Sequence, residues 1–112
     1  MLNRLQAVLD RAHRGHTYVT DAQLHGVPEH WDIALVGDCD SFALWCRAEL
    51  AGQGIAADLI LCRTETGEGH LVCSVDGHIL DNRHKWVMRR DDLPYAWLSA
   101  GSPDGTWRRI TA

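Results

Sequence analysis

The sequence predicts an α+β fold in which helices pack on one antiparallel β-sheet. The chain has 112 residues. Apolar residues recur at helical spacing in its first half, and short apolar runs alternate with turn signals in its second half. A chain of this length forms one compact domain, so residues 1–112 are expected to be a single domain. Helices that precede strands in sequence are typical of α+β domains with an antiparallel sheet.

The first expected helix spans residues 2–14. Its apolar stripe at helical spacing consists of Leu2, Leu5, Val8, Leu9 and Ala12. Gly15 marks its end. Residues 17–36 follow as an irregular loop, and a loop of this length in a small domain is often functional.

A second helix is expected from about Cys39 to Ala51. Asp38 precedes it as the N-cap, and Gly52 or Gly54 ends it. Its apolar stripe consists of Phe42, Ala43, Cys46 and Leu50. This placement puts Cys39 in the first turn of the helix.

Short strands are expected in the second half. Residues 56–63 and 70–75 are rich in apolar residues, and a polar turn with two glycines separates them at 64–69. Asp76-Gly77 is typical of a two-residue hairpin turn that leads into a third strand at 78–81. The remaining expectations are a fourth strand at 85–89, a loop-rich end marked by Pro94, Gly101, Pro103 and Gly105, and a closing strand at 106–110.

Composition and charge exclude several classes of protein. The chain has 11 basic and 15 acidic residues and a net charge of −4, which argues against a nucleic-acid partner. No apolar run approaches the length of a membrane span. Residues 1–10 have no signal-peptide core, so we expect a cytoplasmic or phage-associated protein.

Cys39 is the candidate nucleophile among the four cysteines. The unpaired N–H groups and the dipole at a helix start stabilise a thiolate, and the reference pKa of a thiol is only about 8.5. The other three, Cys46, Cys62 and Cys73, are expected to be buried packing residues with reduced thiols.

His70 and Asp81 are the candidate partners of Cys39. His70 begins one expected strand, and Asp81 ends the next strand across the Asp76-Gly77 turn. A hairpin closed at that turn makes the two residues near neighbours. The carboxylate would hold the imidazole while the imidazole serves the thiol, which gives a Cys-His-Asp triad. The Cys39 backbone N–H and the Trp31 indole are candidate oxyanion-hole donors in the cleft.

Three motifs resemble the bacterial transglutaminase-like cysteine peptidases, whose best-known member is a periplasmic protease that releases adhesins. They are Gly37-Asp38-Cys39-Asp40-Ser41-Phe42-Ala43, His70-Leu71-Val72 and Ile79-Leu80-Asp81-Asn82. Weaker similarities are Tyr18 to Asp21, His30-Trp31, and Tyr95, Ser99, Gly101 and Trp107. The resemblance implies a papain-like, transglutaminase-like fold and places the catalytic cysteine, histidine and aspartate at Cys39, His70 and Asp81. It also suggests a compact phage or prophage member.

The same resemblance raises the question of calcium. Adhesin-cleaving members bind calcium beside the site, and Asp38 and Asp40 keep two acidic side chains there, but Ser41 departs from the family pattern. Calcium takes six to eight oxygen ligands. We therefore expect that no cofactor is required, with Asp38 and Asp40 as a possible calcium pair.

The sequence thus predicts a cysteine hydrolase that cleaves an amide or peptide bond through a thioester. Its substrate would be a protein or peptide, with a peptidoglycan peptide as one option. Two alternatives remain: a transglutaminase-type acyl transferase, and a catalytically degenerate member that binds a peptide or protein. A weaker one is zinc binding through the three triad residues. His78 and His84 flank Asp81 and could compete with His70 as its partner.

Overall fold

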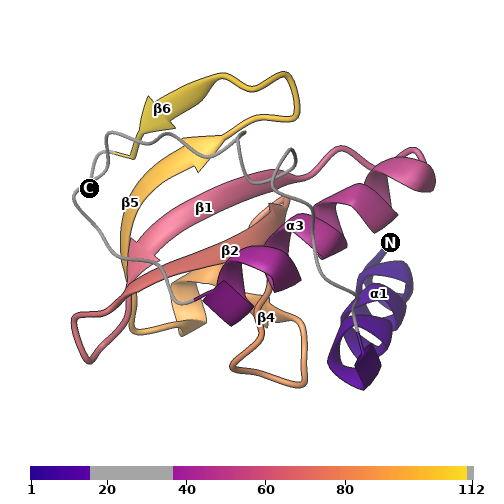
Figure 1. Cartoon of the computed structure of the whole chain (residues 1–112), viewed down its shortest axis with the longest axis horizontal. Coiled ribbons are helices and arrows are strands. Elements are labelled where there is room, and N and C mark those ends of the chain that lie inside the picture. The colour runs from indigo at the N-terminus through magenta and orange to yellow at the C-terminus, as the bar shows by residue number, and fades with distance from the viewer. Residues whose placement is uncertain (16–36, 111–112) are drawn as a thin grey trace.

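The computed structural model describes residues 1–15 and 37–110, with the side chains of residues 37–41 left out. Within these ranges, two helices pack on a six-stranded antiparallel sheet (Figure 1). The helices are α1 (Leu2–Gly15) and α3 (Gly37–Gly52). The strands are β1 (Asp58–Arg63), β2 (Gly69–Val75), β3 (His78–Leu80), β4 (Met88–Arg89), β5 (Ala96–Gly101) and β6 (Trp107–Arg109), and a 3₁₀ turn, η1, spans Arg90–Asp92. The predicted α+β class is confirmed.

The sheet has the strand order β4-β3-β2-β1-β5-β6. The hairpin turns between β1 and β2 and between β2 and β3 were both predicted. Asp76 and Gly77 have φ angles of 49° and 81°, as a tight turn with two left-handed residues requires. The two central strands, β1 and β2, are almost wholly buried.

The prediction of a loop-rich end was wrong for β5. This strand pairs with β1 along Leu59↔Gly101 to Arg63↔Ala96 and lies inside the sheet. Its sequence has no β-branched residue, and Pro94 and Gly101 flank its apolar stretch. Proline and glycine are typical turn signals, but long-range pairing with β1 outweighs this weak local preference. The loop predicted at 17–36 lies outside the described residues.

The beginning of α3 also differs from the prediction. The helix starts at Gly37, so Asp38 lies inside its first turn and is not the residue before it. Cys39 keeps its predicted place in the first turn. At the other end, the helix stops at Gly52, and Gly54 follows in the left-handed region at φ 77°, where a glycine has no steric penalty.

The helices cover one face of the sheet. On this face Leu5 and Leu9 of α1 and Cys46 of α3 share a core with Cys73 and Val75 of β2. Alternate residues of the same strands point to the other face, where Ile60, Cys62, Val72, Ile79 and Tyr95 form a second core. Both cores depend on the same central strands, which fixes the register of the sheet. No helix in the described ranges has the length and apolar character of a membrane span.

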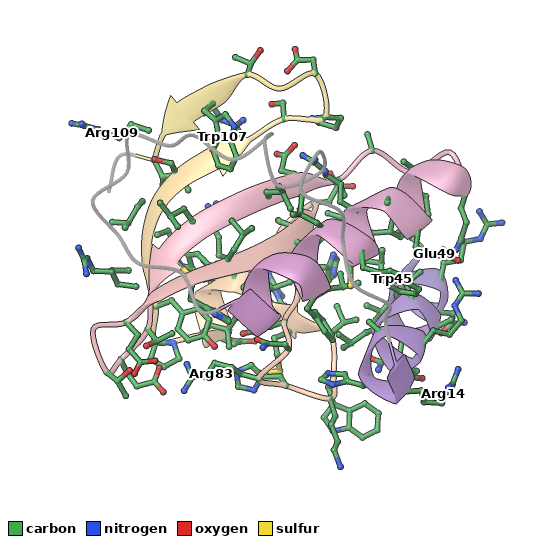
Figure 2. The ribbon with its side chains drawn as sticks, viewed as in Figure 1. Arg14, Trp45, Glu49, Arg83, Trp107 and Arg109 are labelled. Atoms are coloured by element: carbon green, nitrogen blue, oxygen red, sulfur yellow. The ribbon has the colours of Figure 1, made fainter. Side chains whose placement is uncertain are left out.

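Gly101 of β5 pairs with Trp107 of β6, and the two residues are in close contact. Figure 2 shows the Trp107 side chain. A Cβ built on Gly101 would lie 2.5 Å from the Cε2 atom of the indole. A side chain at this position would therefore displace the ring and open β6.

We expect Gly101→Ala to lower the free energy of unfolding by about 1–3 kcal/mol, because it overpacks this contact. Urea unfolding followed by tryptophan fluorescence measures the change. Gly52→Ala is the matched control, since a Cβ there meets no atom within 4 Å. An equal loss of stability in both variants would contradict the role given to the indole.

Candidate active site

The β2–β3 hairpin brings His70 and Asp81 together. The paired residues run from Val75↔His78 to Cys73↔Leu80. Continued by one residue, this register places Asp81 opposite Val72, two residues along the strand from His70. Residues two apart on a strand share a face, and diagonal neighbours across a pair are within reach of long side chains. The predicted contact between His70 and Asp81 follows from this register.

The two side chains form a short, buried hydrogen bond. His70 Nε2 lies 2.6 Å from Asp81 Oδ1. The side chains are 5% and 0% exposed, respectively. Because an ionised carboxylate only accepts hydrogen bonds, Nε2 carries the proton in this contact. In the neutral imidazole, Nδ1 is then the nitrogen with a lone pair.

Asp81 accepts three hydrogen bonds from the described residues. Besides the His70 bond, Oδ1 accepts from the Arg83 backbone N–H at 3.0 Å, and Oδ2 accepts from the Tyr95 hydroxyl at 2.6 Å. Burial by itself would raise the pKa of Asp81, but the hydrogen bond and charge of His70, with the bonds from Tyr95 and Arg83, lower it overall. The carboxylate is therefore ionised at neutral pH and holds the imidazole in one orientation.

Tyr95 is the partner of Asp81 that sequence reasoning missed. In the sequence, Tyr95 belongs only to one of the weaker similarities to the family. Tyr95 directly precedes β5, whose first residue, Ala96, pairs with Arg63 of β1, which in turn pairs with Gly69. This pairing places the phenol beside the start of β2, with its ring edge-on to the His70 ring at 5.6 Å between centroids. Burial, followed by the bond to Asp81 and its charge, raises the pKa of the Tyr95 hydroxyl.

Arg83 closes the outer side of this network. Its Nη1 atom lies 3.1 Å from the Tyr95 hydroxyl, and the guanidinium forms a two-armed ion pair with Glu65 of the β1–β2 turn. The hydrogen bond from Arg83 lowers the pKa of the Glu65 carboxyl to about 2. Figure 2 shows Arg83 at the end of the sheet where β1 turns into β2. Arg83 thus links that turn to the segment after β3.

His84 is near Asp81 but is not its main partner. Its Nε2 atom lies 3.8 Å from Asp81 Oδ2 and 3.3 Å from the Tyr95 hydroxyl. The backbone carbonyl of His84 contacts His13 Nε2 of α1 at 2.7 Å, which holds this segment against the helix. His78 contacts the Val75 carbonyl at 3.2 Å, and strand alternation puts it on the face away from Asp81, so it does not compete with His70.

The first turn of α3 reaches the same end of β2. Figure 1 shows α3 running along β2 in the same direction. Ala43 packs with Leu71 in one cluster. Cys39 precedes Ala43 by four residues, or about 6 Å of helix, and about 6 Å of strand separates Leu71 from Gly69. The backbone of Cys39 is thus level with the residues just before His70.

The face on which His70 lies restricts how the two groups can meet. Leu71 and Cys73 point toward α3, so His70 points to the other face, where it packs against Tyr95. A group on the first turn of α3 can reach the imidazole only around the start of the strand, where Gly69 has no side chain. The side chains of Cys39, Asp38 and Asp40, and the whole of Trp31, lie outside the described residues.

The three cysteines whose side chains are described are all buried, as predicted. Burial, then the charges of Cys73 and Glu49, raises the pKa of the Cys46 thiol well above its usual range. Burial raises the pKa of Cys73 to about 12. Cys62 points to the second core, with its Sγ atom 3.4 Å from the His70 carbonyl oxygen. Neither Cys46 nor Cys73 is suited to be a thiolate at neutral pH.

Comparison with known proteins decides the family. The sequence model of the family described as "bacterial transglutaminase-like cysteine proteinase" matches residues 1–112. The chain belongs to this family. Membership supports cysteine peptidase function for the chain, which fits the predicted class. No protein with a curated description matches it.

A solved structure of the calcium-bound LapG of Legionella pneumophila has a similar fold. The two share 17% sequence identity with a TM-score of 0.68, and the match covers 98% of this chain and 71% of LapG. The arrangement of helices and sheet in this chain is therefore similar to that in LapG. Among the described residues, no group of three or more His, Cys, Asp or Glu side chains is placed to hold a metal ion.

The pKa of Asp81 makes a prediction about stability. Because folding lowers this pKa, the ionised Asp81 carboxylate stabilises the folded state. This stabilisation is complete above about pH 4, the pKa of the carboxyl in the unfolded chain. It is lost as the pH falls through the lower pKa of the folded state. We expect Asp81→Asn to cost about 2–4 kcal/mol of unfolding free energy at pH 7, since it removes one partner of a buried pair. Urea unfolding from neutral to acidic pH measures this.

The difference in unfolding free energy between wild type and Asp81→Asn should become smaller as the pH falls below about 4. Asp92→Asn, a change at an exposed residue of η1, serves as the control and should stay within about 0.5 kcal/mol of wild type. A gap between wild type and Asp81→Asn that is constant over the whole pH range would show that the carboxylate charge is not what stabilises the fold.

Proposed function

We propose that the chain is a cysteine peptidase that cleaves a peptide or amide bond through Cys39, His70 and Asp81. The observation that carries the proposal is the buried His70–Asp81 hydrogen bond, which fixes the proton on Nε2 and leaves the Nδ1 lone pair to act as a base. The first turn of α3, with Cys39, is level with the start of the same strand. Family membership supplies the reaction class.

In the first half of the proposed reaction, the imidazole takes the proton of the Cys39 thiol at Nδ1. The thiolate then attacks the carbonyl carbon of the scissile bond and forms a tetrahedral oxyanion. As the carbon–nitrogen bond breaks, the imidazolium returns the proton to the leaving amine. The products of this half are a thioester on Cys39 and a free amine.

In the second half, water resolves the thioester. The His70 imidazole takes a proton from the attacking water, and the proton passes to the Cys39 sulfur as the carbon–sulfur bond breaks. The carboxylic acid product leaves, and the thiol is restored. Asp81 stays ionised throughout and stabilises the imidazolium that forms in each half.

The oxyanion requires hydrogen-bond donors that are already in place. In the proposal, the Cys39 backbone N–H is one such donor, because the first N–H groups of a helix have no partner within the helix. The helix dipole of α3 favours both the thiolate and the oxyanion at the same point. The indole of Trp31 is proposed as the second donor. The substrate is a protein or peptide, and a peptidoglycan peptide is one option.

The first test is the reactivity of Cys39. In wild type, iodoacetamide should label Cys39 rapidly well below pH 8.5, the reference pKa of a thiol. It should label Cys46 and Cys73 slowly, because burial raises their pKa. His70→Ala should remove the fast labelling at low pH. Mass spectrometry of proteolytic fragments measures each thiol separately.

Hydrolysis of fluorescently labelled casein then tests the reaction itself. Cys39→Ala and His70→Ala should each abolish it, while Cys46→Ala, in the core on the helix side of the sheet, serves as the cysteine control. Full activity in either triad variant would refute the mechanism. A reactive Cys39 without casein hydrolysis would point to a narrower substrate, and a Cys39 that labels no faster than Cys46 would refute the proposal.

Tyr95 is a positioning residue in this proposal, since it acts through Asp81. We expect Tyr95→Phe to leave the fold intact and to lower kcat by about ten- to a hundredfold, because a hydrogen bond to an ionised carboxylate contributes about 1.5–3 kcal/mol. Because the carboxylate then has one donor fewer, the pH profile of Cys39 labelling should shift at its alkaline side. The pH profile of labelling separates this effect from a loss of stability, which would lower activity without moving the profile.

Calcium is a candidate ion, because the LapG structure is calcium-bound. In this chain Asp38 and Asp40 offer two carboxylates at the start of α3, well short of the six to eight oxygens that calcium takes. We therefore propose that the reaction does not require calcium.

Casein hydrolysis and Cys39 labelling are expected to be equal in EGTA and in excess calcium chloride. A loss of both in EGTA that calcium restores, and that Asp40→Ala reproduces, would overturn this part of the proposal.

A further inference from the structure

His13, near the end of α1, contacts two other elements at once. Its ring lies against the Phe42 ring of α3, with 4.9 Å between the ring centroids and an angle of 56° between the ring planes. Its Nε2 atom lies 2.7 Å from the His84 carbonyl oxygen. Because a carbonyl oxygen only accepts hydrogen bonds, Nε2 carries the proton and donates it in this contact. One imidazole thus joins α3 to the segment after β3.

On the helix side, the contact lies close to Cys39 along the chain. Phe42 follows Cys39 by three residues, which is about 4.5 Å along the axis of α3. The Phe42 side chain is 3% exposed and belongs to the core that both helices share with β2. Because the interior is close-packed, a shift of this ring would move the first turn of α3 with it. The place of that turn therefore depends on what lies against Phe42.

On the other side, the contact lies close to the His70–Asp81 pair. The backbone N–H of His84 donates to the Asp81 carbonyl oxygen at 3.2 Å, which closes a turn between the two residues. The carboxylate of Asp81 holds His70 Nε2 at 2.6 Å. The carbonyl to which His13 donates is therefore one turn away from the carboxylate that orients the imidazole.

We propose that His13 is a positioning residue, which sets the distance between the first turn of α3 and the His70–Asp81 pair. The ring contact fixes it to one element, and the hydrogen bond fixes it to the other. The inference rests on the proposed function for what this distance does, since the thiol and the imidazole must meet around the start of β2. A misplacement of about 1 Å between reacting groups can cost about a hundredfold in rate.

Gln6 provides a matched control on the same helix. Its carboxamide donates to the Lys85 carbonyl at 2.9 Å and accepts from the Val87 backbone N–H at 3.0 Å. Gln6 therefore also ties α1 to the segment after β3. It lies seven residues before His13, about 10 Å along the helix axis, and its hydrogen bonds reach residues that are farther along the chain from Asp81 than His84.

The test compares His13→Ala with Gln6→Ala in the full chain. At pH 7, iodoacetamide labelling of Cys39 should slow by about ten- to a hundredfold in His13→Ala. The rate of casein hydrolysis at saturating casein should fall with it, while KM for casein stays the same. Gln6→Ala removes two hydrogen bonds between the same elements and should lower the free energy of unfolding, but its labelling rate should remain that of wild type.

Equal labelling rates in wild type and His13→Ala, or equal losses of rate in the two variants, would overturn the proposal. Circular dichroism and urea unfolding show whether each variant is folded under the assay conditions. If His13→Ala does not fold, His13→Phe takes its place in the comparison, because it keeps a ring against Phe42 and loses only the hydrogen-bond donor.

NMR spectra distinguish this proposal from the proposed function. If Cys39 of wild type labels no faster than Cys46, the peptidase proposal falls. Amide signals of residues 37–40 that move in His13→Ala but not in Gln6→Ala would then still support His13 as the residue that places this turn, and unmoved signals would overturn it. If Cys39 is equally reactive in wild type and His13→Ala, the His13 proposal falls and the peptidase proposal stands.

Discussion

The structure around the candidate site depends on one buried charge. Asp81 is fully buried and ionised, and a carboxylate in that position is tolerated only where several donors replace the water it has lost. His70, Tyr95 and the Arg83 backbone supply those donors from three different segments. The requirement to satisfy this charge therefore determines how β2, the segment after β3 and the start of β5 come together.

This dependence explains why the helices alone do not define the site. Both helices cover the face of the sheet that carries Leu71 and Cys73, whereas His70 belongs to the opposite face. Within the described part of the chain, the first turn of α3 and that second face approach each other at the start of β2. Gly69 leaves the space there open, and a pocket whose lining includes Gly69, His70 and Asn82 lies alongside it.

Local signals predicted much of this arrangement. The two helices, the Asp76-Gly77 turn and the contact between His70 and Asp81 all follow from periodicity and turn chemistry within short stretches of sequence. Tyr95 and β5 were missed because their places depend on pairing with β1, more than thirty residues earlier. No local pattern reports such pairing. Asp38 was assigned as the N-cap from its residue type, yet the helix begins one residue before it.

The β2–β3 hairpin has a further consequence for how the site is assembled. His70 and Asp81 are only eleven residues apart and are joined by a turn with its own conformational preference. Hairpins close within about 1–10 μs, whereas the docking of a helix on a sheet requires contacts between distant parts of the chain. The acid–base half of the proposed triad is thus a local unit that can form first. The nucleophile joins it only when tertiary packing is complete, so a partly folded chain would carry the base without a thiol to activate.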